Sequence, residues 1–107
     1  MMTQEQVFHV LGKWQEENTL LHVVARFPDC TMGLDCRIMG FYERSIGFKA
    51  MAEYDAFEIF ISGFRFDYSE PQDLESAISG ERIYSAGLSG SKSTGESIAI
   101  MKVKLSN

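Results

Sequence analysis

Apolar residues alternate with polar ones through most of the chain between residues 20 and 68, and turn-forming residues interrupt this pattern at short intervals. Alternation with a period of two is typical of strands that bury one face. Five strands are predicted, over Leu20–Phe27, Thr31–Tyr42, Ile46–Met51, Phe57–Ser62 and Phe64–Tyr68. Because each gap between them is short enough for a hairpin, we expect these strands to form an antiparallel sheet.

The second predicted strand is unusually long and contains two glycines, Gly33 and Gly40. Glycines inside a strand mark bends or bulges. A long strand that is bent at two points can serve both sheets of a small barrel. In the first strand, the better core face carries Leu21, Val23, Ala25 and Phe27.

A helix is predicted over residues 3–18. Thr3 and Gln6 have the spacing of a capping box, in which each side chain binds the other residue's backbone amide. The apolar stripe that follows is formed by Val7, Val10, Leu11 and Trp14. We expect this stripe to lie on an open end or face of the barrel, and the helix to end near Asn18.

The remainder, residues 69–107, is predicted to be an extension of the barrel. Gln72–Ser79 could form two helical turns, Ser97–Leu105 reads as a sixth strand, and Lys102 and Lys104 suit an edge strand. Residues 85–97 have the serine- and glycine-rich composition of a flexible loop. The fold class is therefore mainly β: an N-terminal helix, a bent five-stranded antiparallel barrel of Sm-like or SH3 type over residues 19–68, and this extension.

Length and charge limit the function. A chain of 107 residues supports one domain over residues 1–107. The formal net charge is −5, and basic residues do not outnumber acidic ones in the helix, the barrel or the extension. Because non-specific nucleic-acid binding depends on cationic contacts to phosphate, a general DNA or RNA coat protein is disfavoured.

The chain shows no secretion signal and no apolar run long enough to span a membrane, so we expect a cytoplasmic protein without membrane contact. Cys30 and Cys36 match no zinc spacing, and six residues of extended strand separate them by more than a disulfide can bridge. We expect two free thiols, no metal site and no cofactor.

The helix, the consecutive strands and the segment Ile59–Gly63 together resemble the Sm-like family, over about residues 3–68. This resemblance implies a small barrel that forms rings through its edge strands. Sm-like proteins that bind uridine-rich RNA use a cation before that glycine, and Ser62 stands there in this chain. Phe41 and Tyr42 fall where the family has a hydrophobic residue followed by Asp. Ile46 and Gly47 occupy the region where the family has its Asn. The resemblance therefore does not extend to the RNA-binding residues.

Other residues are candidates for a binding site. Arg37, Lys49 and Arg65 share strand parity and could converge on one outer face that binds an anion or RNA. Tyr42, Ser62 and Gly63 join them as candidate binding residues because they occupy the region where the resembled family binds RNA.

Several further groups have simpler interpretations. His9 and His22 have no sequence neighbour that would orient them, so they read as surface or half-buried histidines. An acidic cluster reads as a solvated turn, because its spacing fits no cation-binding loop; it contains Asp67, Glu70, Asp73 and Glu75.

Three functions remain open. The first is a non-enzymatic protein that self-associates as a homo-oligomer, or binds a protein partner, through sheet edges and exposed apolar residues. Its candidate interface residues are Met39, Phe41 and Phe60. The second is an Sm-like RNA-binding protein with an atypical basic face. The third, an enzyme or small-ligand carrier with a pocket at the barrel mouth, ranks last because no nucleophile, base and orienting group occur together.

Overall fold

The computed structural model describes residues 2–51, 56–69 and 83–104, which form one helix and seven strands. These elements are α1 (Gln4–Glu16), β1 (Leu21–Phe27), β2 (Cys30–Phe41), β3 (Ser45–Ala50), β4 (Ala56–Phe60), β5 (Arg65–Ser69), β6 (Ile83–Ser91) and β7 (Ser97–Lys104). The helix predicted at residues 72–79 lies outside the described residues.

The seven strands form one antiparallel sheet in the order β4-β3-β2-β1-β7-β6-β5. The prediction of a mainly β fold with an N-terminal helix and antiparallel strands is therefore confirmed. The five-stranded closure predicted for residues 19–68 is wrong. Strand β1 pairs with β2 on one side and with β7 on the other, while β5 pairs with β6, so the C-terminal strands take the place where a five-stranded barrel would close.

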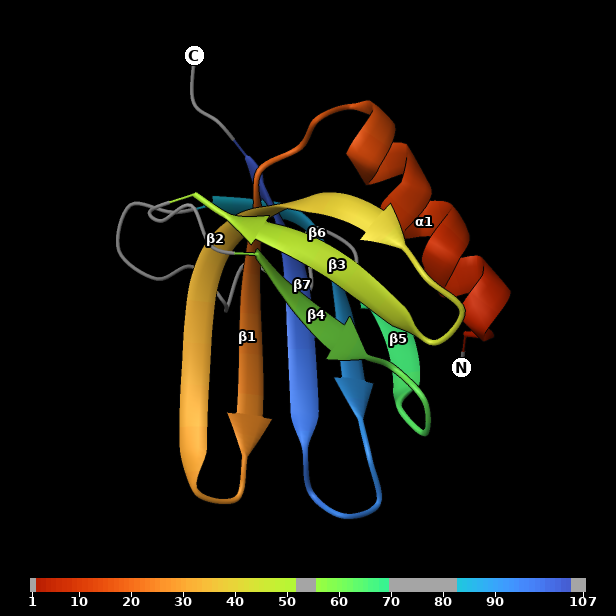
Figure 1. The fold of residues 1–107 in the computed structure, drawn as a ribbon, viewed down its shortest axis with the longest axis vertical. Coiled ribbons are helices and arrows are strands. Elements are labelled where there is room, and N and C mark those ends of the chain that lie inside the picture. Colours follow the sequence, from red (N-terminus) through yellow and green to blue (C-terminus); the bar gives the residue numbers. More distant parts are fainter. Residues whose placement is uncertain (1, 52–55, 70–82, 105–107) are drawn as a thin grey trace.

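Strand β2 connects two layers of the sheet. Residues Cys30–Cys36 pair with β1, and Cys36–Phe41 pair with β3, with a register shift between Ile38 and Gly40. Figure 1 shows the upper part of β2 curving over, so that β3 and β4 cross in front of β1 and β7. The predicted bend at Gly40 is confirmed by this irregularity, whereas the one predicted at Gly33 is wrong, because pairing is regular there. The strand joins two layers of a single sheet, not two sheets of a barrel.

The flexible loop predicted over residues 85–97 is a second error. Residues 85–91 belong to β6, whose inward positions include the buried residues Ala86 and Leu88, and β7 begins at Ser97. Small residues are needed on β6 because its neighbours are bulky: the Phe66 ring lies over Gly90. Strand β7 is also not an edge strand, because β1 and β6 pair with it on either side.

Helix α1 packs on the inner face of the sheet, where Figure 1 shows it lying beside β3 and the curved end of β2. Val7, Leu11 and Trp14 are buried, as predicted, and the capping box between Thr3 and Gln6 is formed. Asn18 follows the helix with φ 51°. Among the described residues, no helix has the length and apolar character that a membrane crossing requires.

The core lies between this helix and the inner face of the sheet. The inward positions predicted for β1 are correct up to Ala25, whereas Phe27 is 45 % exposed at the strand end. The largest fully buried side chains are Phe48, Leu11, Leu21, Ile46, Leu88, Ile100, Val7, Val23 and Cys36. They come from both sheet layers and from the helix, so the three are held together by one apolar cluster.

Candidate functional site

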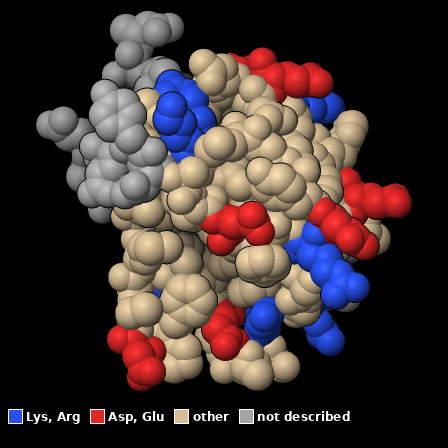
Figure 2. All heavy atoms as spheres, viewed as in Figure 1, with Lys and Arg blue, Asp and Glu red and all other residues tan. Residues whose placement is uncertain are grey.

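The three candidate cations occupy two separate places on the outer face of the sheet. Arg37 and Lys49 are direct cross-strand partners on β2 and β3. The Arg37 guanidinium donates hydrogen bonds to the Asn18 carbonyl oxygen and to the Met51 sulfur. Arg65 lies on β5, at the opposite edge of the sheet. The three side chains therefore do not converge, and Figure 2 shows acidic and basic groups interspersed on the face above β3 and β4.

Ser62 and Gly63 form the turn that separates β4 from β5. The Phe64 amide donates to the Ile61 carbonyl oxygen, and Gly63 adopts φ 83°, a conformation that glycine tolerates better than other residues. Both residues are exposed. The reversal predicted at Gly63 is confirmed, and its glycine serves backbone geometry.

Two exposed aromatic side chains flank Ser45 in one cross-strand row. Phe60 on β4 lies opposite Ser45, and the Tyr42 amide donates to the Ser45 carbonyl oxygen from the other side. Phe60 is 65 % exposed and Tyr42 is 53 % exposed. The Ser45 hydroxyl donates to Glu58, the neighbouring outward residue of β4. We call these four residues, Tyr42, Ser45, Glu58 and Phe60, the Phe60 surface.

The other two predicted interface residues lie on β2 and differ in exposure. Met39 is 53 % exposed, and its carbonyl oxygen accepts a hydrogen bond from Gln15 of α1. Phe41 is half-buried, and its ring centroid lies 5.2 Å from that of Phe8. Phe41 therefore contributes to helix packing, whereas Met39 leaves its side chain on the surface.

Among the described strands, β4 is an edge of the sheet, and its hydrogen-bonding groups alternate between β3 and the side on which no described strand lies. The Ile61 amide donates to the Arg44 carbonyl oxygen, which fixes that pair as hydrogen-bonded. In an antiparallel ladder the next such pairs are two residues further along. The backbone groups of Ala56, Glu58 and Phe60 therefore point away from β3, toward the open edge.

The other edge strand, β5, has a partner on its outer side. Met2 forms an antiparallel bridge with Phe66, and the Met2 amide donates to the Phe66 carbonyl oxygen at 2.9 Å. The N-terminal segment thus occupies the middle of this edge.

The structure also orients His22, which the sequence left without a partner. His22 and Asp35 are direct cross-strand partners, and Nδ1 of His22 lies 2.8 Å from Oδ1 of Asp35. The His22 ring stacks near Tyr84, with 6.2 Å between the ring centroids. A Cβ atom at Gly33 would lie 3.5 Å from Nε2 of His22, an ordinary van der Waals distance, so Gly33 lies against the imidazole.

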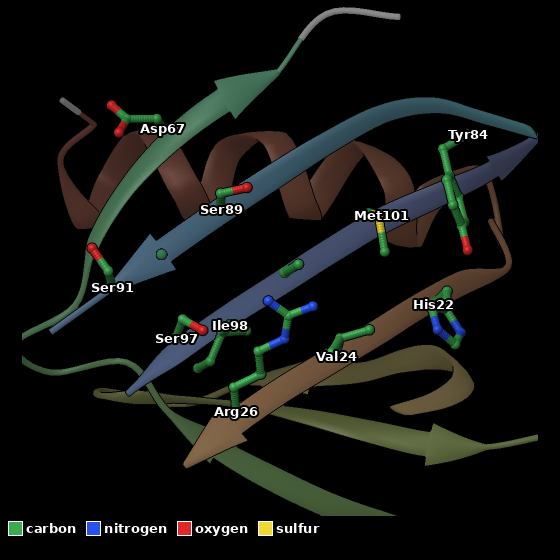
Figure 3. Close-up of a pocket in the computed structure, with 12 residues that line it drawn as sticks. His22, Val24, Arg26, Asp67, Tyr84, Ser89, Ser91, Ser97, Ile98 and Met101 are labelled. Atoms are coloured by element: carbon green, nitrogen blue, oxygen red, sulfur yellow. The ribbon is translucent and has the colours of Figure 1, made fainter. Parts of the chain in front are cut away.

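His22 and Tyr84 stand at one end of a groove of about 680 Å³ on the sheet face opposite α1 (Figure 3). Strands β1, β7, β6 and β5 form its floor. Ser89 and Ala99 lie opposite each other in the middle, and their small side chains leave the space open. Asp67, a member of the predicted acidic cluster, lies on β5, on the opposite side of the groove from β1.

Comparison with known proteins adds no family assignment. No protein-family model, curated protein or solved structure matches this chain. Inference about function therefore depends on the geometry of the Phe60 surface, the open β4 edge and the groove.

Both cysteines are free thiols, as predicted. Cys30 is exposed, while Cys36 is buried. Burial is the main cause that raises the pKa of Cys36 to about 12, and the nearby negative charge of Asp35 adds to it. Among the residues that the structure describes, no three His, Cys, Asp or Glu side chains are grouped so that they could hold a metal ion. Glu70, Asp73 and Glu75 of the predicted acidic cluster lie outside the described residues.

Proposed function

We propose that this protein is a non-enzymatic module that self-associates through strand β4. The observation that carries the proposal is the 65 % exposure of Phe60 on a sheet edge whose outward backbone groups have no strand beside them in the described part of the chain. An exposed strand edge offers a template for pairing with another chain, and a large exposed aromatic side chain gains free energy when it is covered.

A second copy of the chain is the partner that fits this edge. The opposite edge, β5, already carries Met2, so a head-to-tail contact between β4 and β5 would displace the N-terminal segment. Pairing of β4 with β4 of the second copy leaves that bridge in place. In such a contact a two-fold axis relates the two copies, and the same strand of each copy forms the interface, so the assembly stops at a dimer.

Charge selects the register of this strand pairing. If Glu58 lay opposite Glu58 of the second copy, two carboxylates would face each other, which destabilises a strand pair. A register centred on Ile59 instead places each Glu58 opposite Phe60 of the second copy. The outward backbone groups of both residues can then form hydrogen bonds, and each Phe60 ring is covered by the neighbouring strand.

Sedimentation velocity over a range of protein concentrations tests the proposal. We expect the wild-type protein to shift from monomer to dimer with rising concentration, and the Phe60→Ser variant to remain monomeric at concentrations where the wild type is dimeric. Phe27→Ser is the matched control, because Phe27 is 45 % exposed at the end of β1, away from β4. A wild-type protein that stays monomeric throughout, or equal loss of dimer in both variants, would refute the proposal.

A further inference from the structure

The groove on the outer face contains an arginine beside two serine hydroxyls. Arg26 on β1 lies directly opposite Ser97 on β7, and Ser97 lies directly opposite Ser91 on β6. Arg65 on β5 completes the row, opposite Ser91. Cross-strand partners point to the same face of a sheet, so these four side chains all stand on the groove side.

Arg26 is available to bind a ligand. No hydrogen bond or ion pair joins its side chain to any other residue in the described part of the chain. Figure 3 shows the guanidinium reaching from β1 across the groove toward the middle of β7, between Ser97 and Met101. A guanidinium with neighbouring hydroxyl donors is well suited to a carboxylate, because two N–H groups can bind both carboxylate oxygens.

The rest of the groove is suited to an uncharged body. Between Arg26 and Tyr84 the floor consists of small and apolar side chains, including Val24, Ala99 and Met101. The aromatic ring of Tyr84 closes that end beside His22. A cavity of 680 Å³ is within the usual range for small-molecule sites, roughly 300–1,000 Å³.

The β5 side of the groove carries charges of both signs. The carboxylate of Asp67 lies on β5 across the groove from Arg26 (Figure 3), and Arg65 stands two residues before it on the same face. Because opposite charges stand side by side there, the β5 side offers no net positive charge for a second anionic group. The arrangement therefore supports one carboxylate, bound at Arg26.

We infer that the groove is a binding site for a small aromatic or aliphatic carboxylate. The carboxylate binds Arg26 and the hydroxyls of Ser97 and Ser91, and the apolar part lies over Ala99 toward Tyr84. This site is formed by β1, β5, β6 and β7, so it is separate from the β4 edge and does not depend on self-association.

A titration followed by ¹H–¹⁵N NMR tests this inference on the full chain, with 3-phenylpropionate as the probe and its neutral amide as the comparison. We expect saturable shifts at the amides of Arg26, Ser91 and Ser97, and affinity for the acid at least about ten-fold higher than for the amide, since a charge-assisted pair is lost. Arg26→Gln should remove this difference. Arg44→Gln, at an exposed arginine in the turn before β3, should retain it.

Three results would overturn the site: no saturable shift with 3-phenylpropionate, equal affinity for acid and amide, or unchanged discrimination in Arg26→Gln. The Phe60→Ser variant separates the two proposals. It should bind 3-phenylpropionate as the wild type does, because none of the groove residues lies on β4.

Discussion

The Phe66 ring lies so close to Gly90, its cross-strand partner on β6, that a Cβ atom at residue 90 would come within 2.6 Å of it. Phe66 is 2 % exposed, so the ring has little freedom to move away. We therefore expect Gly90→Ala to lower the free energy of unfolding by about 1–3 kcal/mol, as overpacking does in other cores. Urea denaturation measures this change.

Gly12 provides the matched control for that substitution. It lies inside α1, and no atom would lie within 4 Å of a Cβ atom there. Gly12→Ala should raise the free energy of unfolding by up to about 1 kcal/mol through helix propensity. Equal effects of the two alanines would contradict the close packing of Phe66 on β6.

Truncation of Leu11 tests the packing of α1 on the sheet. It is fully buried between the helix and the sheet. Leu11→Ala should destabilise the fold by about 2–5 kcal/mol, because it removes buried methyl groups and leaves a cavity. Glu16→Ala, at an exposed position of the same helix, should change stability by less than about 0.5 kcal/mol. If Leu11→Ala unfolds at the same urea concentration as the wild type, the helix does not pack as described.

The two cysteines should differ in reactivity and in their dependence on pH. Cys30 is exposed and should react with an aromatic disulfide reagent in the native protein, whereas Cys36 should react only after unfolding. Because the folded pKa of Cys36 is raised to about 12, its neutral thiol favours folding fully below the unfolded pKa. That contribution should be lost as pH rises from about 9 toward 12.

Cys36→Ala tests this alkaline effect. In this variant the free energy of unfolding should fall less steeply between about pH 9 and pH 12 than in the wild type. Identical slopes would show that Cys36 is already ionised or accessible in the folded protein.

The end of α1 is tied to β7 by an ion pair that should respond to acid. Lys102 donates a hydrogen bond to the Glu17 carboxylate at 2.8 Å. This hydrogen bond is the main cause that lowers the pKa of Glu17, and the positive charge of Lys102 adds to it. A lowered folded pKa stabilises the protein above the unfolded pKa, and the effect is lost as pH falls through the folded value. In Lys102→Met, NMR titration should give a higher Glu17 pKa, near that of an unpaired glutamate.

Salt provides the control for this pair. Glu17 is exposed, so added salt should raise its pKa in the wild type and have a smaller effect in Lys102→Met. A Glu17 pKa that does not change in the variant would contradict the contact between α1 and β7.

The parts of the fold that the sequence predicted are those set by local spacing. The capping box at Thr3 and the apolar stripe of α1 are both readable from three- and four-residue intervals, and both are present. The pairing of His22 with Asp35 could also be predicted from the sequence. A two-residue connection at Pro28–Asp29 pairs Phe27 with Cys30, and counting back along both strands places His22 opposite Asp35.

The errors occur where long-range contacts decide the outcome. The composition of residues 85–91 is that of a loop, yet Leu88 is fully buried and Gly90 lies beneath the ring of Phe66. The sequence predicts that Lys102 protects an edge strand, but Lys102 binds Glu17 from a central strand. Neither Phe66 nor Glu17 is close to these residues in sequence, so no local pattern could reveal the contacts.

The groove escaped prediction for the same reason. Arg26, Ser97 and Ser91 come from three strands, and only the register of β1, β7 and β6 brings them into one row. Their residue types are unremarkable when they are read along the chain. The outward position of Phe60 on β4, in contrast, follows from the alternation of its strand and agrees with its 65 % exposure.

Hydrogen–deuterium exchange of the β4 amides tests self-association through this strand most directly. At concentrations where the protein is monomeric, we predict fast exchange at Ala56, Glu58 and Phe60 and slow exchange at Phe57 and Ile59, which bind β3. At dimer-forming concentrations, the amides of Glu58 and Phe60 should become protected. If both continue to exchange rapidly while the protein is dimeric, the copies do not pair through β4.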